Sequence, residues 1–162
     1  MKPLTYAEVG ATETGALPPG YRHLRYRTAI GHDVFTVAAE AVLTWRMHRA
    51  AGIKVDTAAE RAAPGVDVTM HVGPLPAPCR VVWAVDQPKR AGWGYGTLPG
   101  HPARGEEAFV VSQGDDGTTW FEVIAFSVPA GWLMRSAGPV GRLFQRTYAM
   151  WCARALRRLA NA

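Results

Sequence analysis

The 162-residue sequence predicts an α+β fold in which a curved antiparallel sheet of about six strands wraps around a long C-terminal helix. Three observations predict this fold. Several short segments alternate apolar and polar residues with a period of two, as half-buried strands do. Most of these segments follow one another through short Gly/Pro-rich turns, which favours antiparallel neighbours. From Pro139 onward the apolar spacing becomes helical, and a helix laid across the concave face of the sheet would bury that face.

The composition is that of a globular protein, with 48% hydrophobic and 19% charged residues. The length suits a single domain over residues 1–162. Residues 1–20 end in "ALPPG" and predict an irregular lead-in, so the folded core is expected over residues 21–162. The first twenty residues lack a signal-peptide core and no 18-residue apolar run occurs, so we expect a cytoplasmic protein without membrane insertion. The oligomeric state is left open.

A strand and a helix come first. "YRHLRYRTAI" (21–30) alternates strictly, which predicts a strand with one solvated face. "HDVFTVAAEAVLTWRMHRAAG" follows with helical spacing, and we expect one amphipathic helix between an Asp33 N-cap and a Gly52 stop. His48 would then lie near the C-terminal end of that helix, where cations suit the helix dipole.

Five further strands are expected, over residues 65–73, 79–87, 91–98, 105–113 and 118–128. "PLPAP" would be a rigid connector between the first two, and "GDDG" the turn before the last. The last strand is apolar on both faces, so it should be central or covered.

The terminal helix should be about 20 residues long, with Pro139 in its first turn. Its apolar stripe is Val140, Leu143, Phe144, Tyr148, Trp151, Cys152, Ala155 and Leu159. Arginines 142, 146, 154 and 157 occupy the other side. We expect the apolar stripe to face the sheet.

Three blocks carry a family resemblance: "YAEVGAT" near the start, "GYGTLPGHPARGEEAF" in the middle, and "FSVPAGWLMRSAGPVGRLFQRTY" near the end. In this order they resemble the uncharacterised protein family 0548 of bacteria and plants. The order of elements is similar to the helix-grip fold of the START and birch-pollen-allergen (SRPBCC) superfamily. That resemblance implies an apolar cavity between sheet and helix, and it carries no catalytic residue to this chain.

Charge and cysteine content limit the partners. The net charge of +5 comes from arginine, much of it between Arg135 and Arg158, and its simplest interpretation is a solvated helix face. With no aromatic residues interleaved on the arginine face, nucleic acid is not favoured. Cys79 and Cys152 are far apart and are interpreted as reduced thiols. No Cys/His spacing suggests a metal, and "GWGYG" does not open onto a helix, so neither metal nor cofactor is expected.

The stretch "HPARGEEAF" (101–109) holds the first candidate site. Glu106 and Glu107 point to opposite faces of a strand, so at most one of them looks into the cavity. One interpretation is structural, with a carboxylate tying the hairpin through its backbone N–H groups. The other places one carboxylate at the pocket mouth, with His101 available for acid–base work.

Glu122 is the second candidate, because it lies mid-strand between large apolar residues. If it pointed into the cavity, burial would raise its pKa and suit it to orient a ligand or act as a base. The alternatives are a cross-strand pair with an arginine such as Arg80, or a position on the exposed convex face.

The leading prediction is a cavity that binds a hydrophobic or polyketide-like small molecule. Its expected ligand-binding residues are Trp83, Trp93, Tyr95, Trp120, Glu122, Phe144 and Tyr148. An alternative is an enzyme in that cavity, such as a cyclase, aromatase or isomerase. Its candidates for proton transfer are Glu122, Glu107, His101 and Tyr95. A second alternative is a structural or partner-binding module with a solid core.

Overall fold

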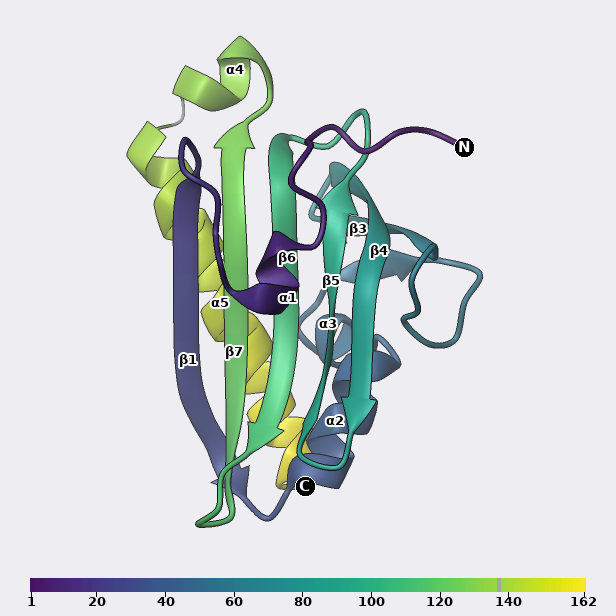
Figure 1. The fold of residues 1–162 in the computed structure, drawn as a ribbon, viewed down its shortest axis with the longest axis vertical. Coiled ribbons are helices and arrows are strands. Elements are labelled where there is room, and N and C mark those ends of the chain that lie inside the picture. Colours follow the sequence, from purple (N-terminus) through teal and green to yellow (C-terminus); the bar gives the residue numbers. More distant parts are fainter. Residues whose placement is uncertain (137) are drawn as a thin grey trace.

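The computed structural model describes residues 1–136 and 138–162. They form a seven-stranded antiparallel sheet in the order β1-β7-β6-β5-β4-β3-β2, with a long helix, α5, along its concave face (Figure 1). The elements are α1 (Ala11–Thr14), β1 (Arg22–His32), α2 (Phe35–Leu43), α3 (Arg46–Ala50), β2 (Lys54–Asp56), β3 (Asp67–Val72), β4 (Leu75–Gln87), β5 (Arg90–Thr97), β6 (Ala103–Gln113), β7 (Thr118–Pro129), α4 (Gly131–Ser136) and α5 (Gly138–Ala160). The α+β prediction with a curved sheet and a long C-terminal helix is confirmed.

The sheet is a meander whose first strand returns to its last. Strands β2 to β7 each pair with the next along the chain, and β1 then pairs with β7. The alternation predicted for the first strand is present, since Leu24 and Tyr26 pack against the core while His23 and Arg25 are exposed. Because β7 lies between β1 and β6, it is central, as its two apolar faces predicted.

One strand was not expected, and one prediction about the strands was wrong. The sheet has a seventh strand, β2, whose three residues are too few to show an alternating pattern. "PLPAP" is not a connector, because β4 begins at Leu75 and pairs with β3 through Pro76 and Pro78. Prolines are tolerated there because this end of β4 pairs with β3 alone, and β5 joins only from Cys79 onward.

The single helix expected before the sheet is also wrong, because it is broken into α2 and α3. The break is at Trp45, whose φ of 68° lies in the left-handed region that side chains rarely adopt. Its indole is fully buried, donates a hydrogen bond to the Ala59 carbonyl at 3.0 Å and lies 5.1 Å from the Trp93 ring. These contacts hold the backbone turn, and α3 consequently aims Met47 and His48 into the core. The N-cap is Val34, not Asp33.

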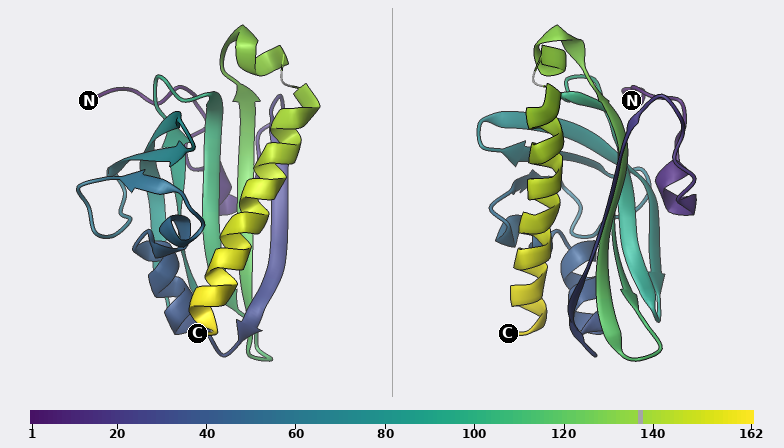
Figure 2. Two further views of the ribbon diagram at one scale, coloured as in Figure 1. Left: turned by 180° about the vertical axis from the view of Figure 1, so that it is seen from behind. Right: turned by 90° about the vertical axis from the view of Figure 1, so that its left-hand side faces the viewer.

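The helices fill the two ends of the concave face differently. Helices α2 and α3 pack against the C-terminal half of α5, and α2 also contacts β5 and β6 (Figure 2). There α5 buries small residues such as Ala149 and Ala153, which allow close approach. The N-terminal half of α5 is not covered by α2 and α3. Val140, Leu143 and Trp151, which were expected to face the sheet, are 69%, 67% and 41% exposed.

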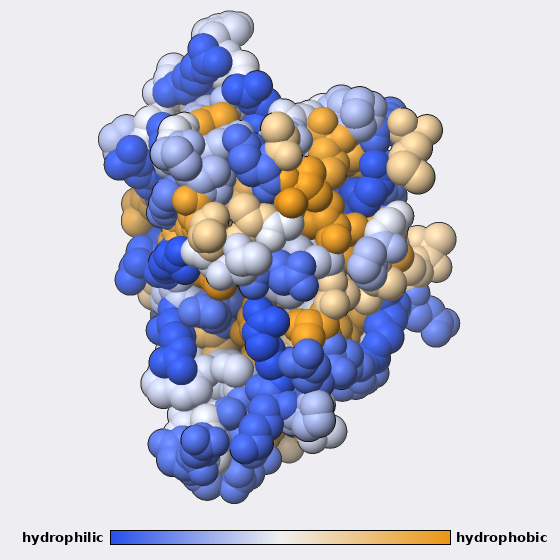
Figure 3. Space-filling model, in the orientation of Figure 1, coloured by the Kyte–Doolittle hydropathy of each residue, from blue (hydrophilic) through white to orange (hydrophobic). Residues whose placement is uncertain are grey.

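The first residues lie on the outer, convex face of the sheet and are not wholly irregular, since they include α1 (Figure 2). They pack onto the glycines of "GWGYG". The indole of Trp83 occupies the space where a side chain at Gly94 would stand, and the ring of Tyr6 does so at Gly96. The Thr5 N–H donates to the Thr97 carbonyl at 3.0 Å. Figure 3 shows this face, mostly hydrophilic, with apolar residues gathered over β4 and β5.

Within residues 1–136 and 138–162, no helix combines the length and apolarity that a membrane span requires.

Candidate functional site

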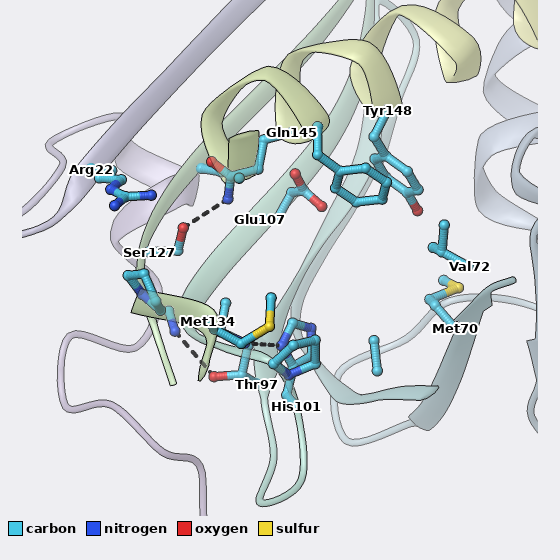
Figure 4. A pocket seen from close by; sticks show the side chains of 18 of the residues that line it. Arg22, Met70, Val72, Thr97, His101, Glu107, Ser127, Met134, Gln145 and Tyr148 are labelled. Carbon is cyan, nitrogen blue, oxygen red and sulfur yellow. Dashed lines mark hydrogen bonds between the residues drawn. The ribbon is translucent and has the colours of Figure 1, made fainter. Parts of the chain in front are cut away.

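A pocket of about 370 Å³ lies between the N-terminal half of α5 and the concave face of the sheet. Its wall is predominantly apolar and comes from β3 to β7, α4 and α5, with Met70, Ala125, Met134 and Phe144 among its residues (Figure 4). The pocket is at the end of the concave face that α2 and α3 leave uncovered. Its size falls in the range of roughly 300–1,000 Å³ that is usual for small-molecule sites.

Glu107 is the carboxylate that faces this pocket. On β6 it shares a face with Phe109 and Val111, which pack in the core, and it stands opposite Tyr95 of β5. The Tyr95 hydroxyl donates to Glu107 Oε1 at 3.0 Å. Burial raises the pKa of Glu107 to about 7, while the hydrogen bond from Tyr95 lowers it by less. Near neutral pH this carboxyl therefore exists in both protonation states.

Glu106 points the opposite way and is 2% exposed beneath the N-terminal segment. It accepts hydrogen bonds from the Tyr6 hydroxyl at 2.5 Å, the Gly10 N–H at 2.8 Å, and the Thr12 N–H at 3.0 Å, and from the Thr12 hydroxyl. The structural interpretation holds for this residue, since its carboxylate does tie backbone N–H groups. Those groups belong to the segment around α1, however, and not to the hairpin beside it.

His101 lines the pocket, in the loop between β5 and β6. Its Nδ1 accepts a hydrogen bond from the Ala103 N–H at 2.9 Å, and burial lowers the pKa of the imidazole to about 4. Near neutral pH this ring is therefore uncharged. Among the described residues no hydrogen bond joins His101 to Glu107, so the two do not form a dyad in this structure.

Tyr95, Phe144 and Tyr148 supply the aromatic part of the wall. Burial raises the pKa of both tyrosines well above the usual value, so both phenols stay protonated. The Tyr148 hydroxyl is buried and makes no hydrogen bond of normal geometry within the part of the chain that the structure describes, although the Tyr95 hydroxyl lies close enough to lower its pKa slightly. A buried hydroxyl without a partner is costly, which marks it as a group that a ligand would satisfy.

Polar side chains also line the side of the pocket next to α5. Gln145 donates a hydrogen bond to the Ser127 hydroxyl at 2.8 Å, and Arg22 lies 3.4 Å from the Gly138 carbonyl (Figure 4). These contacts connect the start of α5 to β1 and β7.

Four of the predicted site residues do not line the pocket, and three of these four lie on the outer face of the sheet. Trp120 and Glu122 alternate with Phe121 and Val123, which pack in the core, so they lie on the outer face, where Arg27 stacks 3.7 Å over Trp120. Trp83 is also on the outer face and donates from its indole to the Thr12 hydroxyl at 2.8 Å. The proposed pair between Glu122 and Arg80 is wrong.

Arg80 binds Asp67 at 2.6 Å. Trp93, the fourth residue outside the pocket, is fully buried in the core and donates to the Val42 carbonyl at 2.9 Å. None of the six tryptophans, all of which the structure describes, lines the pocket.

His48 is the residue that sequence reasoning missed. It is fully buried among the rings of Trp93, Phe109 and Tyr148, and neither ring nitrogen has a hydrogen-bond partner among the described residues. Burial lowers the pKa of the imidazole to about 3, so it is neutral at physiological pH. In the sequence, His48 stands in "LTWRMHRA", and an unbroken helix would have placed it near the C-terminal end of that helix. No other feature of the sequence pointed to this residue.

No metal or redox chemistry is suggested by the described residues. Among them, no group of three or more His, Cys, Asp or Glu side chains could hold a metal ion. Cys79 and Cys152 are both free and buried, as expected, and burial raises the pKa of both thiols. Such thiols are poor nucleophiles.

Comparison with solved structures shows the fold. The crystal structure of the hypothetical protein jhp0584 from Helicobacter pylori has a TM-score of 0.66 at 8% identity, covering 99% of this chain and 97% of that one. The major latex-like protein 151 from Panax ginseng has a TM-score of 0.59 at 16% identity, covering 85% and 96%. These likenesses establish the helix-grip fold and nothing about activity.

Sequence comparison identifies the family. The model described as "Domain of unknown function (DUF1990)" matches residues 5–155. A UPF0548 protein of Deinococcus radiodurans is 34% identical over 174 aligned residues, which cover 97% of this chain and 87% of that protein. The chain therefore belongs to the UPF0548 family, whose defining domain has no assigned function.

Proposed function

We propose that the protein binds a hydrophobic small molecule in the pocket beneath α5. The observation that carries this proposal is the pairing of an apolar wall with Glu107, whose carboxyl faces the pocket. Its one described hydrogen-bond partner is Tyr95, so acceptor positions remain for a ligand. The unpartnered Tyr148 hydroxyl adds a second polar group on the same wall. The ligand class is an apolar or aromatic molecule that carries a hydroxyl or a similar hydrogen-bonding group.

The geometry favours this function over a solid structural core. A void of about 370 Å³ would remove packing contacts from its lining, and a protein gains nothing from that loss unless the space is occupied. The raised pKa of Glu107 also favours a binding function. It shows that the carboxyl is buried, and burying a carboxyl destabilises the fold, which a purely structural core would avoid.

Ala125→Phe is expected to weaken ligand binding at least tenfold. Ala125 lies on β7, lines the pocket and faces the same space as Glu107, so a phenyl ring there would fill the site. Nile red, an uncharged aromatic dye, serves as the probe in a fluorescence titration. The matched control is Ala29→Phe, at an exposed position on the outer face of β1. Equal affinities for all three proteins would refute the pocket as the binding site.

The natural ligand itself is best sought by organic extraction of the purified protein followed by mass spectrometry. An apolar compound that accompanies the wild type and is absent from Ala125→Phe would support the proposal.

Acid–base catalysis on the bound molecule is the second candidate function. It is favoured by one observation, the carboxyl of Glu107 with a pKa of about 7, poised to take up or release a proton at neutral pH. Tyr95 fixes the orientation of that carboxyl. A cyclase, aromatase or isomerase would need such a group.

Hydrogen–deuterium exchange into the extracted ligand tests this second function. In D₂O at pH 7, wild-type protein should label an acidic C–H position of the ligand, and Glu107→Gln should reduce that rate by about 10²-fold or more. Glu122→Gln, a matched substitution on the outer face, should label the ligand like the wild type. If Glu107→Gln binds the ligand but exchanges it at an unchanged rate, Glu107 is not the base.

A further inference from the structure

The C-terminal helices concentrate the positive charge of the protein. Residues 123–162 contain six arginines and no Asp or Glu, whereas residues 1–122 hold 12 Lys or Arg against 13 Asp or Glu. All six are exposed. A fold that is otherwise nearly neutral thus presents one strongly cationic side.

The same helices expose large apolar side chains. Trp132 on α4 is 79% exposed, and on α5 Val140 and Leu143 are 69% and 67% exposed. Met150 and Trp151, further along α5, are 38% and 41% exposed. At 100° per residue these α5 positions lie on the side opposite the buried Cys152 and Leu156, together with Arg154. Of the four arginines expected on the other side of the helix from Val140, Leu143 and Trp151, Arg154 therefore lies on their side.

The exposed apolar residues meet the pocket at its rim. Val140 and Phe144 are exposed and also line the pocket, and Met134 of α4 lines it next to them. Figure 2 shows α4 and the start of α5 at the end of the molecule opposite the C-terminus. The cationic apolar surface and the pocket entrance therefore form one continuous region, defined here as the α4–α5 face.

We infer that the α4–α5 face docks on the surface of an anionic lipid membrane. Its composition is that of an interfacial amphipathic helix, with Trp and aliphatic side chains between arginines. Trp132 and Leu143 would enter the boundary between headgroups and acyl chains. Arg135 and Arg154 would meet lipid phosphates, which guanidinium groups bind bidentately.

Charge argues against a second copy of the chain as the occupant. A symmetric contact through this face would place arginines against arginines, with no carboxylate between residues 123 and 162 to offset them. Nucleic acid would satisfy the arginines but leave the aliphatic Val140 and Leu143 without a matching surface. A bilayer satisfies both components of the face.

Docking in this orientation would place the pocket entrance at the bilayer. An apolar ligand could then pass between the acyl region and the pocket without crossing water. This part of the inference rests on the proposed ligand-binding function, whereas docking itself rests on the surface alone.

Vesicle co-sedimentation tests the docking. Wild-type protein should bind vesicles of 70% phosphatidylcholine and 30% phosphatidylserine at least tenfold more strongly than vesicles of phosphatidylcholine alone, and 0.5 M NaCl should weaken that binding. Arg135→Gln/Arg154→Gln should lower the affinity at least fivefold, and so should Trp132→Ala/Leu143→Ala. All four side chains are exposed, so both variants are expected to fold.

Two controls separate the outcomes. Arg25→Gln/Arg27→Gln removes the same charge from the outer face of β1 and should leave vesicle binding within twofold of the wild type. Ala125→Phe should also bind vesicles normally, so a failed ligand proposal and a failed docking proposal give different results. Absence of vesicle binding by the wild type would overturn the inference, as would equal losses in both arginine pairs. Binding to a 20-nucleotide RNA instead of vesicles would assign the face to nucleic acid.

Discussion

Glu107→Gln is expected to raise the free energy of unfolding at pH 8 by up to about 3 kcal/mol. The carboxyl ionises at about 7 in the folded chain and at 4.5 in the unfolded chain. Between these values the unfolded state has lost the proton that the folded state keeps, so stability falls as the pH rises from 4.5 to 7. Each pKa unit corresponds to about 1.4 kcal/mol, and the amide of glutamine can still accept the Tyr95 hydrogen bond.

Urea unfolding at pH 8 and pH 4 measures this effect. The stabilisation should be present at pH 8 and should vanish at pH 4, where the carboxyl is protonated in both states. Glu122→Gln, on the outer face of β7, is the matched control. A variant that is no more stable than the wild type at pH 8 would show that Glu107 is well solvated in the folded protein.

A stabilising substitution at Glu107 would also be informative about function. Removal of a group that destabilises the fold, with loss of ligand binding or exchange, is the signature of a residue retained for its chemistry.

His48 is expected to give the opposite pH dependence. Its pKa is about 3 in the folded chain, against 6.5 in the unfolded chain. Below pH 6.5 the unfolded state takes up a proton that the buried ring refuses, so stability falls as the pH drops toward 3. Between pH 6.5 and 4.5 this residue alone should reduce the free energy of unfolding by about 2 kcal/mol.

His48→Phe should abolish that part of the acid sensitivity. Relative to the wild type, the variant should gain about 2 kcal/mol of stability between pH 6.5 and 4.5. His101, whose pKa is also lowered, remains in both proteins and cancels in the difference. His23→Phe, at an exposed position on β1, should show no such gain.

The titration of His48 can also be followed directly. In wild-type protein labelled with ¹³C-histidine, the NMR signal of His48 should stay at its neutral position down to pH 4.5. A midpoint near 6.5 would show that water reaches the ring, and would remove the basis of the prediction.

The alternation of apolar and polar residues predicted most of the sheet. Successive side chains of a strand point to opposite faces, so a half-buried strand carries apolar residues at every second position. The alternation did not reveal β2, since three residues carry no period. It also missed the break at Trp45, because helical spacing continues through residues 33–52 and the break depends on a cavity for an indole ring. That cavity is built by Ala59 and Trp93, which lie far from Trp45 along the chain.

The candidate site was predicted only in part, for a related reason. Strand geometry showed that Glu106 and Glu107 face opposite sides, but both faces of β6 are buried, so neither side looked more exposed than the other. The outer face is buried because the N-terminal segment covers it, and no local pattern in residues 1–20 indicates that contact. The same hidden cover explains why Trp83 looked like a cavity residue.

The glycines of β5 and the carboxylate of Glu106 together indicate the order in which parts of the chain can fold. Thr5, Tyr6 and Thr12 bind Thr97 and Glu106, nearly a hundred positions later in the sequence. The groove that receives them does not exist until β5 and β6 have paired. The segment around α1 can therefore take its place only after that pairing, and until then Glu106 stays open to water.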